Sequence, residues 1–346
     1  MAPDRRHRAT GISWSTFHNF TTVLRQCLAQ WALGRGIWIM VRRLILSALV
    51  ALTASGALAE GRVGLGWGRI FTNDQMGDGE DRWRSGSYTL SLVRGPSGSR
   101  FGAAGFAALG FGEVFELRGH AEVIAPANLT AITPADRRYA GLMSVGANTH
   151  FGWQGAEVVL GGELAMTGSD TGIGAFHDWF HGLLGMVPPS AAVLDAQIGS
   201  NVYPGLNAEI GRSFAVGAVQ ARPFAEARAG VETLVRIGAD VTIGDLGRDD
   251  LMLRDVTTGQ RYRGVEGSRD TGLSLTLGGD LAQVLDSALL PPAGVQAEDQ
   301  RYRLRAGLHW QGNRTGLFYG VSYLSPEFTS QPEGQLVGAL SLNLRF

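Results

Sequence analysis

Apolar residues occupy every second position in successive segments of about ten residues from residue 60 to the C-terminus, with turn-rich breaks between the segments. The last segment places Leu340, Leu342, Leu344 and Phe346 on one face and Ser341, Asn343 and Arg345 on the other. Successive side chains of a β-strand point to opposite faces. Such a segment therefore has one apolar and one polar face, which is typical of a transmembrane β-strand.

The same alternation recurs along the chain. Apolar residues alternate with polar ones or with glycine in Val63, Leu65 and Trp67; in Val235, Ile237, Ala239, Val241 and Ile243; in Tyr302, Leu304, Ala306, Leu308 and Trp310; and in Leu317, Tyr319, Val321 and Tyr323. Counting such segments gives about ten to fourteen, and bacterial barrels have an even number of strands. We predict an all-β fold, a transmembrane antiparallel β-barrel over residues 60–346 in the bacterial outer membrane.

A soluble β-sandwich also shows alternation, so the polar positions have to decide between the two folds. Here Arg303, Arg305 and Asp240 oppose apolar and aromatic side chains on segments long enough to cross a bilayer. A sandwich would bury one face in a core, whereas a barrel wets one face and exposes the other to lipid. The charged face, together with Trp and Tyr near strand ends, favours the barrel.

One segment departs from strand periodicity. Between Gly172 and Gly185, the apolar residues recur at three- and four-residue spacing, namely Ile173, Phe176, Phe180, Leu183 and Leu184. This spacing predicts a short amphipathic helix. Ser169 or Asp170 is expected to cap its start, and Pro188 and Pro189 bar its continuation. A helix between two barrel strands must lie in a loop at one rim, where functional residues are common.

The N-terminal region predicts export. Residues 40–59 contain two arginines, an apolar run and the small-residue site Ala57-Leu58-Ala59, which together indicate a cleaved signal peptide. A transmembrane helix is the alternative, but about sixteen residues fall short of the roughly twenty that a span needs. The mature chain would then begin near Glu60. Residues 1–39, with the sole cysteine Cys27, are interpreted as an over-long start of the gene model, which leaves no disulfide in the mature chain.

Composition adds two limits. The formal net charge of −1 excludes a polycationic nucleic-acid binder, so no nucleic-acid partner is expected. The 50 glycines show no collagen-like period, and they suit a curved sheet in which strands approach closely.

Two groups of residues could carry chemistry. His177 and His181 are four residues apart in the predicted helix and therefore share one face. Their spacing suits a metal, although the glutamate of zinc-protease helices does not follow His177. The second group follows the first strand and contains oxygen donors suited to a hard cation, namely Asn73, Asp74, Asp78, Glu80, Asp81 and Ser85. Counting by twos places Asp74 and Ser85 on the polar faces of adjacent strands.

These residues together resemble a known family. Asn73-Asp74, Asp81-Arg82-Trp83 with Ser85, the block Asp136-Arg137-Arg138-Tyr139-Ala140-Gly141, the helix with His181 and the final Phe346 are similar to motifs of the outer-membrane lipid A 3-O-deacylases. The similarity extends over most of residues 60–346. It implies a twelve-stranded barrel whose active site lies between the wall and a loop helix.

The resemblance also implies an activity. Family members hydrolyse the ester of the 3-linked acyl chain of lipid A in lipopolysaccharide and depend on Ca²⁺. By motif match, His181 is the general base that activates water, Asn73, Asp74 and Ser85 are catalytic, and Asp74 is the candidate Ca²⁺ ligand. Phe346 is expected to mark the last strand for the barrel assembly machinery, and the outer-membrane lipid is the remaining partner.

The sequence departs from the family pattern at two places. Arg84-Ser85-Gly86-Ser87 stands where the family has Tyr-Thr-x-Gly, and Val187 stands near the position of a glutamate that follows the helix histidine. The sequence shows no Gly-x-Ser-x-Gly motif, which argues against a serine hydrolase. Besides the esterase, a passive channel and a catalytically silent barrel remain open at this point. A barrel of about twelve strands leaves little open lumen for a channel.

Overall fold

The computed structural model describes residues 62–267, 270–291 and 294–344. The predicted signal peptide at 40–59, the extension at 1–39, the expected start at Glu60 and the terminal Phe346 lie outside the described residues.

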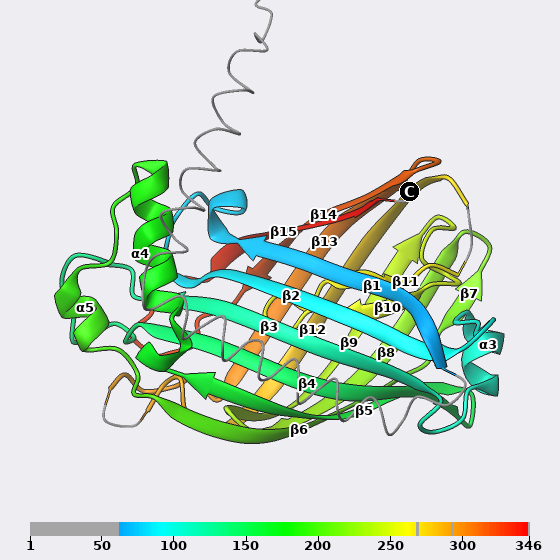
Figure 1. The fold of residues 1–346 in the computed structure, drawn as a ribbon, viewed down its shortest axis with the longest axis horizontal. Helices are drawn as coiled ribbons and strands as arrows, with labels where there is room; N and C mark the ends of the chain where they lie inside the picture. The colour runs from blue at the N-terminus through cyan, green and yellow to red at the C-terminus, as the bar shows by residue number, and fades with distance from the viewer. Residues whose placement is uncertain (1–61, 268–269, 292–293, 345–346) are drawn as a thin grey trace, which may run out of the picture. The chain divides into compact units, whose positions relative to one another are not determined.

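The described chain forms a closed antiparallel barrel of twelve strands, as the alternation predicts (Figure 1). The wall strands are β1 (Arg62–Asn73), β2 (Trp83–Pro96), β3 (Val114–Ala125), β4 (Ala140–Trp153), β5 (Ala156–Thr167), β6 (Asn201–Gly211), β8 (Val219–Ala229), β9 (Glu232–Ile243), β12 (Gly272–Ser287), β13 (Gln300–Gln311), β14 (Thr315–Leu324) and β15 (Gln335–Leu344). Pairing of β1 with β15 and of β6 with β8 closes the sheet. The short strand β7 (Phe214–Val216) extends the edge of β8.

The two faces of the wall differ as the sequence predicts. Apolar side chains along the strands are exposed on the outside, including Trp67, Leu304, Leu308, Leu340 and Leu342. Their polar neighbours Arg303, Arg305, His309 and Ser341 are buried in the lumen. An apolar outer band around a polar interior matches the surroundings of a barrel in the outer membrane, which is where this fold places the protein.

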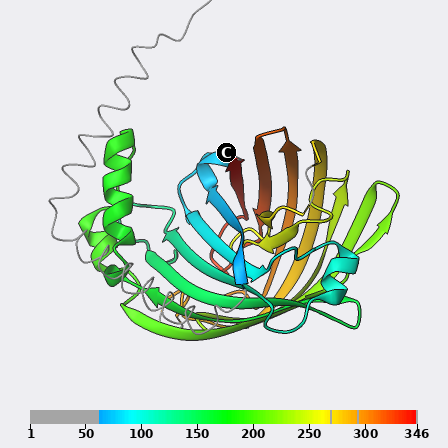
Figure 2. The same cartoon turned by 45° about the vertical axis from the view of Figure 1, so that its right-hand side comes forward.

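The barrel has two rims with different loops (Figures 1 and 2). The rim that we call the α4 rim lies where β1, β3 and β5 end, and it carries the helices η1 (Asp74–Met76), η2 (Ser169–Thr171), α4 (Ile173–Leu184) and α5 (Ala191–Asp195). The opposite terminal rim lies where β1 begins and β15 ends, and it carries α3 (Ala103–Ala108). Connections at the α4 rim include 168–200 between β5 and β6.

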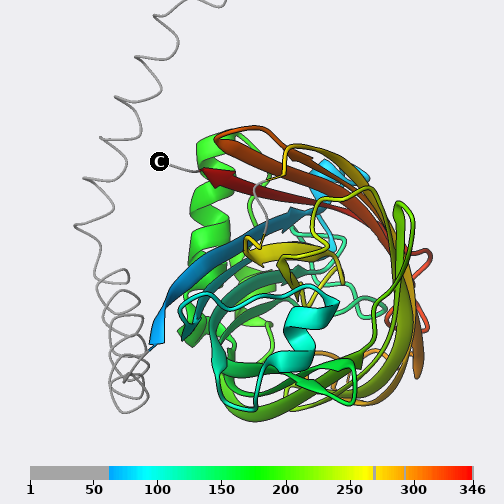
Figure 3. The same cartoon turned by 90° about the vertical axis from the view of Figure 1, so that its right-hand side faces the viewer.

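A hairpin from the terminal rim fills part of the lumen. The connection between β9 and β12 forms a separate two-stranded sheet of β10 (Leu251–Arg254) and β11 (Arg261–Val265). Figure 3 shows it inside the ring of wall strands, with α3 in front of it. Leu253 and Tyr262 of the hairpin pack with Ile70 of β1 and Phe106 of α3 in one buried cluster. Apolar packing thus holds the hairpin against the inner wall.

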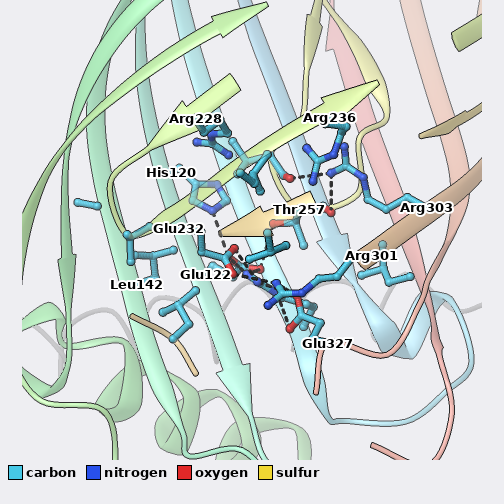
Figure 4. A pocket seen from close by; sticks show the side chains of 18 of the residues that line it. His120, Glu122, Leu142, Arg228, Glu232, Arg236, Thr257, Arg301, Arg303 and Glu327 are labelled. Carbon is cyan, nitrogen blue, oxygen red and sulfur yellow. Dashed lines mark hydrogen bonds and ion pairs between the residues drawn. The ribbon is translucent and has the colours of Figure 1, made fainter. Parts of the chain in front are cut away.

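Ion pairs fill much of the remaining lumen. Near the α4 rim, the Arg84 guanidinium lies 3.2 Å from the Glu122 carboxylate, 3.0 Å from that of Glu232 and 2.8 Å from that of Glu327. Figure 4 labels these three glutamates beside Arg301. Arg301 joins Glu232 at 2.9 Å. A cavity of about 70 Å³ remains among these side chains. Each of these five charged groups has a partner of opposite charge, as burial in a low-dielectric interior requires.

The helix predicted between Gly172 and Gly185 is present as α4. Its N-cap is Gly172, in the left-handed conformation and without a side-chain cap, so the predicted cap by Ser169 or Asp170 is wrong. Both residues instead form η2, the preceding helical turn. Gly185, also left-handed at φ 69°, ends the helix. In the described part of the chain, no helix is both long and apolar enough to cross a membrane.

Candidate active site at the α4 rim

Helix α4 turns its polar side toward the barrel. Its buried residues Ile173, Gly174, His177 and His181 follow each other at spacings of one, three and four. Its apolar residues Phe176, Leu183 and Leu184 are exposed, and the ring of Phe176 stacks on that of Phe180 at 5.7 Å between centroids. The two histidines therefore face the wall while the aromatic side faces outward.

The start of β4 holds α4 against the wall. A Cβ on Gly141 would lie 2.6 Å from Thr171 Oγ1 and 2.7 Å from Ile173 Cβ, so only glycine permits this approach. Two residues earlier, the Tyr139 ring stacks on His177 with 5.8 Å between ring centroids. The Tyr139 hydroxyl also lies 3.2 Å from His177 Nδ1. The block that contains both residues thus positions the helix and its first histidine.

The start of β2 positions the acidic partner. Trp83 is buried and has a φ of 53°, a left-handed backbone conformation that is strained for a bulky residue. A register shift between Arg84 and Gly86 leaves Ser85 as the extra residue of a bulge. Bulges re-aim side chains, and both Arg84 and Ser85 are buried here. Ser85 Oγ donates a hydrogen bond to Asp81 Oδ1 at 2.5 Å.

Asp81, His177 and His181 meet between β2 and α4, and we call them the His–Asp cluster. His181 Nε2 lies 2.8 Å from His177 Nε2 and 3.1 Å from Asp81 Oδ2. His177 Nε2 lies 3.7 Å from Asp81 Oδ1. Among the described residues, this is the group of His, Cys, Asp or Glu side chains whose potential ligand atoms all lie within 4.8 Å of one another.

The hydrogen bond at the far side of His181 fixes its tautomer. Nδ1 of His181 lies 2.7 Å from the carbonyl oxygen of Val187, which can only accept. Nδ1 therefore carries the proton, and in the neutral ring Nε2 has a free lone pair. That lone pair points into the His–Asp cluster. Val187 therefore orients His181 through its backbone carbonyl.

The carboxylates at this rim have opposite pKa shifts. Burial alone would raise the pKa of Asp81, but hydrogen bonds from His177 and Ser85 and the charges of the histidines outweigh it, so its pKa lies below the usual value. Burial raises the pKa of Asp74 to about 9, and the neighbouring charges of Asp81 and Asp78 add to that rise. At neutral pH, Asp81 is therefore ionised and Asp74 is protonated.

Comparisons with known proteins bear on the fold. No protein-family model and no curated protein matches the sequence. Among solved structures, LpxR from Salmonella typhimurium is similar with a TM-score of 0.66 at 14% identity, over 81% of this chain and 99% of LpxR. The translocator domain of autotransporter NalP from Neisseria meningitidis has a TM-score of 0.39 at 10% identity, over 89% of this chain and 99% of that domain.

The chain is an outer-membrane β-barrel. At 14% identity the likeness to LpxR shows the fold alone.

The structure brings some of the predicted site residues together. His181 and Ser85 both contact Asp81. Asn73 caps η1, since its Oδ1 accepts a hydrogen bond from the Gln75 backbone at 2.9 Å. Asn73 also pairs in register with Gly86, the residue after Ser85.

Asp74 lies beside the His–Asp cluster and is not one of its members. Its carboxyl accepts a hydrogen bond from the Arg82 backbone N–H at 2.8 Å, next to Asp81 in the chain. The side chain of Asp74 is buried. Because Asp74 binds the backbone of the residue after Asp81, it helps to hold the Asp81 carboxylate in place.

Sequence reasoning placed Asp81 among the oxygen donors and Tyr139 in a family motif without giving either a role in the site, and it ranked His177 below His181. Two signals point to them in retrospect. Asp81 is four residues before Ser85, and His177 is four residues before His181. The contact between the two pairs depends on the bulge in β2 and on the docking of α4, which no local spacing encodes.

The donor atoms of the His–Asp cluster do not suit Ca²⁺. That ion takes six to eight oxygen ligands, whereas two of the three donors here are imidazole nitrogens. Ser85 could add one oxygen beside Asp81. The cluster thus falls well short of a calcium shell, and no step of the chemistry below uses Ca²⁺.

Proposed function

We propose that this protein is an outer-membrane ester hydrolase that releases the 3-O-linked acyl chain of lipid A. The observation that carries the proposal is the Nε2 lone pair of His181, set by the Val187 carbonyl and adjoining the ionised Asp81. A neutral imidazole with a carboxylate beside it is a general base for water. The motif resemblance to lipid A 3-O-deacylases selects the ester.

The reaction needs three roles. His181 Nε2 takes a proton from water as the oxygen attacks the ester carbonyl, and Asp81 stabilises the imidazolium that forms. We assign stabilisation of the oxyanion to the amide of Asn73, whose oxygen is held by η1 and whose nitrogen lies on the side of Gly86. Protonated His181 then returns the proton to the leaving 3-oxygen of the glucosamine.

The location of the cluster suits a lipid substrate. Exposed Phe176, Leu183, Leu184 and Val187 lie on α4 or directly after it, at one rim of the barrel. Longer loops are typical of the extracellular side of such barrels, so we assign the α4 rim to the surface where lipid A resides. An acyl chain in the outer leaflet can contact this apolar side while its ester reaches His181.

A passive channel is less well supported. The β10–β11 hairpin and the ion pairs occupy the lumen, and the cavity among them measures about 70 Å³. A solute pore needs continuous space along the barrel axis. A catalytically silent barrel remains the alternative that experiment has to exclude.

The test is His181→Ala in protein purified from outer membranes, with lipid A in detergent and product release followed by mass spectrometry. Loss of the general base should lower the rate by roughly 10²- to 10⁴-fold. The barrel should stay folded, because strand pairing holds the wall, and heat-modifiable migration on gels checks this. Asp178→Asn on the exposed side of α4 is the matched control and should keep the wild-type rate.

The outcomes separate the alternatives. Wild-type product from folded His181→Ala would remove the proposed mechanism. No product from the wild type would favour the silent barrel. By the motif resemblance, which matches the second histidine only, His177→Ala should lower the rate much less than His181→Ala.

A further inference from the structure

General-base catalysis by His181 gives His177 no part in the proton transfer itself. Its Nε2 lies 2.8 Å from His181 Nε2, a distance at which two nitrogen lone pairs repel unless something positive lies between them. Asp81 adds a carboxylate oxygen 3.1 Å from the same His181 nitrogen. Three electron-rich atoms therefore converge on one point at the wall.

A proton satisfies this arrangement poorly. If it sits on His177 Nε2 and is donated to His181, the Asp81 carboxylate still faces the lone pair of His181. If it sits on His181 Nε2, it is shared between His177 and Asp81 in a bifurcated hydrogen bond. A divalent cation interacts with all three atoms at once.

We propose that Asp81, His177 and His181 form a binding site for a divalent transition metal, with Zn²⁺ as its best ligand. Imidazole nitrogen with carboxylate oxygen is a donor set that Zn²⁺ prefers. Tetrahedral zinc with ligands about 2.0–2.1 Å away places ligand atoms roughly 3.3 Å apart. His181 Nε2 lies 2.8 Å from His177 Nε2 and 3.1 Å from Asp81 Oδ2, slightly closer than that spacing, and His177 Nε2 lies 3.7 Å from the other oxygen of Asp81, Oδ1.

The outer contacts of the ligands match a metal site. Metal-binding histidines donate their second ring N–H to an oxygen that fixes the ring. His181 Nδ1 has the Val187 carbonyl at 2.7 Å, and His177 Nδ1 has the Tyr139 hydroxyl at 3.2 Å. Asp81 Oδ1 is held by the Ser85 hydroxyl at 2.5 Å. All three proposed ligands are thus oriented by a residue outside the cluster. Because the cluster supplies three ligands, a tetrahedral metal would have one position left for water.

The metal and the base chemistry compete for one lone pair. Zn²⁺ bound to His181 Nε2 occupies the atom that takes the proton from water, so Zn²⁺ inhibits hydrolysis. This consequence rests on the proposed function, whereas the binding site itself does not. Nitrogen donors also make the site selective, since Ca²⁺ binds through oxygen.

The experiment measures metal binding directly. Untagged protein from outer membranes, stripped with chelator and held in detergent, is titrated with Zn²⁺ by calorimetry, and the bound metal is counted after equilibrium dialysis. We expect one Zn²⁺ per chain, with no displacement by millimolar Ca²⁺. His177→Ala should weaken binding by more than the roughly 10- to 100-fold expected for loss of an outer-shell partner. Asp178→Asn, next to His177 but exposed, should bind as the wild type does.

Tyr139→Phe is a second variant that keeps both ring ligands. It removes the oxygen at His177 Nδ1 and should weaken Zn²⁺ binding by roughly 10- to 100-fold. Absence of Zn²⁺ binding, or binding that His177→Ala and Tyr139→Phe leave unchanged, overturns the site. Zn²⁺ binding with these losses but without any lipid A hydrolysis supports the site and counts against the proposed function alone.

Discussion

Asp74 is a carboxyl group whose protonation differs between the folded and unfolded chain. Burial and the charges of Asp81 and Asp78 raise its pKa from 3.8 to about 9 in the fold. A group with a raised pKa binds its proton more tightly when folded. Its contribution to stability is therefore fully present below about pH 4 and is lost as pH rises toward 9.

Asp74→Asn should remove this pH dependence. The amide is uncharged and nearly the same size, and its oxygen can still accept the Arg82 N–H. We expect the wild type to unfold at lower temperature at pH 9 than at pH 6, and Asp74→Asn to show a smaller drop. Heat-modifiable gel migration across temperature measures both. Equal drops in the two proteins would show that Asp74 does not titrate in this range. Loss of hydrolysis in the same variant tests the catalytic role that the motif resemblance implies.

Residue-level prediction succeeded where alternation alone decides the outcome. Ser87, Thr89 and Ser91 are all buried in the lumen, as counting by twos predicts, whereas Ser85 is buried at the bulge of β2 against Asp81. The partner of Ser85 was not predictable in this way. Asp81 lies outside the strand, and its approach to Ser85 depends on the bulge and on the left-handed Trp83.

Among the single elements, α4 matters most to the site, because its position sets the positions of His177 and His181. The helix has few contacts with the wall, and at Gly141 of β4 both Thr171 of η2 and Ile173 of α4 lie where a side chain would be. A side chain there must push Thr171 and Ile173 away. The histidines on the same helix would move with them.

Gly141→Ala should therefore lower hydrolysis without unfolding the barrel. Displacement on the order of 1 Å at a catalytic group costs up to about 10²-fold in rate. Gly119→Ala on β3 is the matched control, because nothing lies within 4 Å of its added Cβ. Lipid A hydrolysis and heat-modifiability are measured on both variants. Full activity in Gly141→Ala would mean that α4 tolerates the shift.

Elements were predictable in proportion to their periodicity. The wall strands and α4 repeat at periods of two and 3.6, so the sequence locates them. The β10–β11 hairpin also alternates, with Leu251 and Leu253 buried against α3 and the wall. Alternation does not distinguish a wall strand from one inside the lumen, because both have an apolar face. The hairpin is placed inside the lumen only because β9 pairs directly with β12 in the wall.

At the scale of the whole barrel, ion pairs between the hairpin and the wall help to fill the lumen. In the hairpin, Arg254 lies 2.8 Å from both the Glu209 and the Asp240 carboxylates of the wall. Arg222 and Arg305 reach the same two carboxylates from neighbouring strands. The wall therefore keeps partial charge compensation without the hairpin, and its twelve strands keep their pairing.

Replacing residues 248–266 by a short Gly-Ser linker should open the lumen. The change removes Leu251, Leu253 and Tyr262 from the lumen and frees the charged inner wall for water. In planar lipid bilayers, we expect no stable single-channel conductance from the wild type and discrete conductance steps from the folded deletion variant. Hydrolysis at the α4 rim should persist, because the His–Asp cluster has no ligand from the hairpin. Conductance by the wild type would support the channel, and a silent deletion variant that remains heat-modifiable would mean that the wall's own ion pairs are enough to close the barrel.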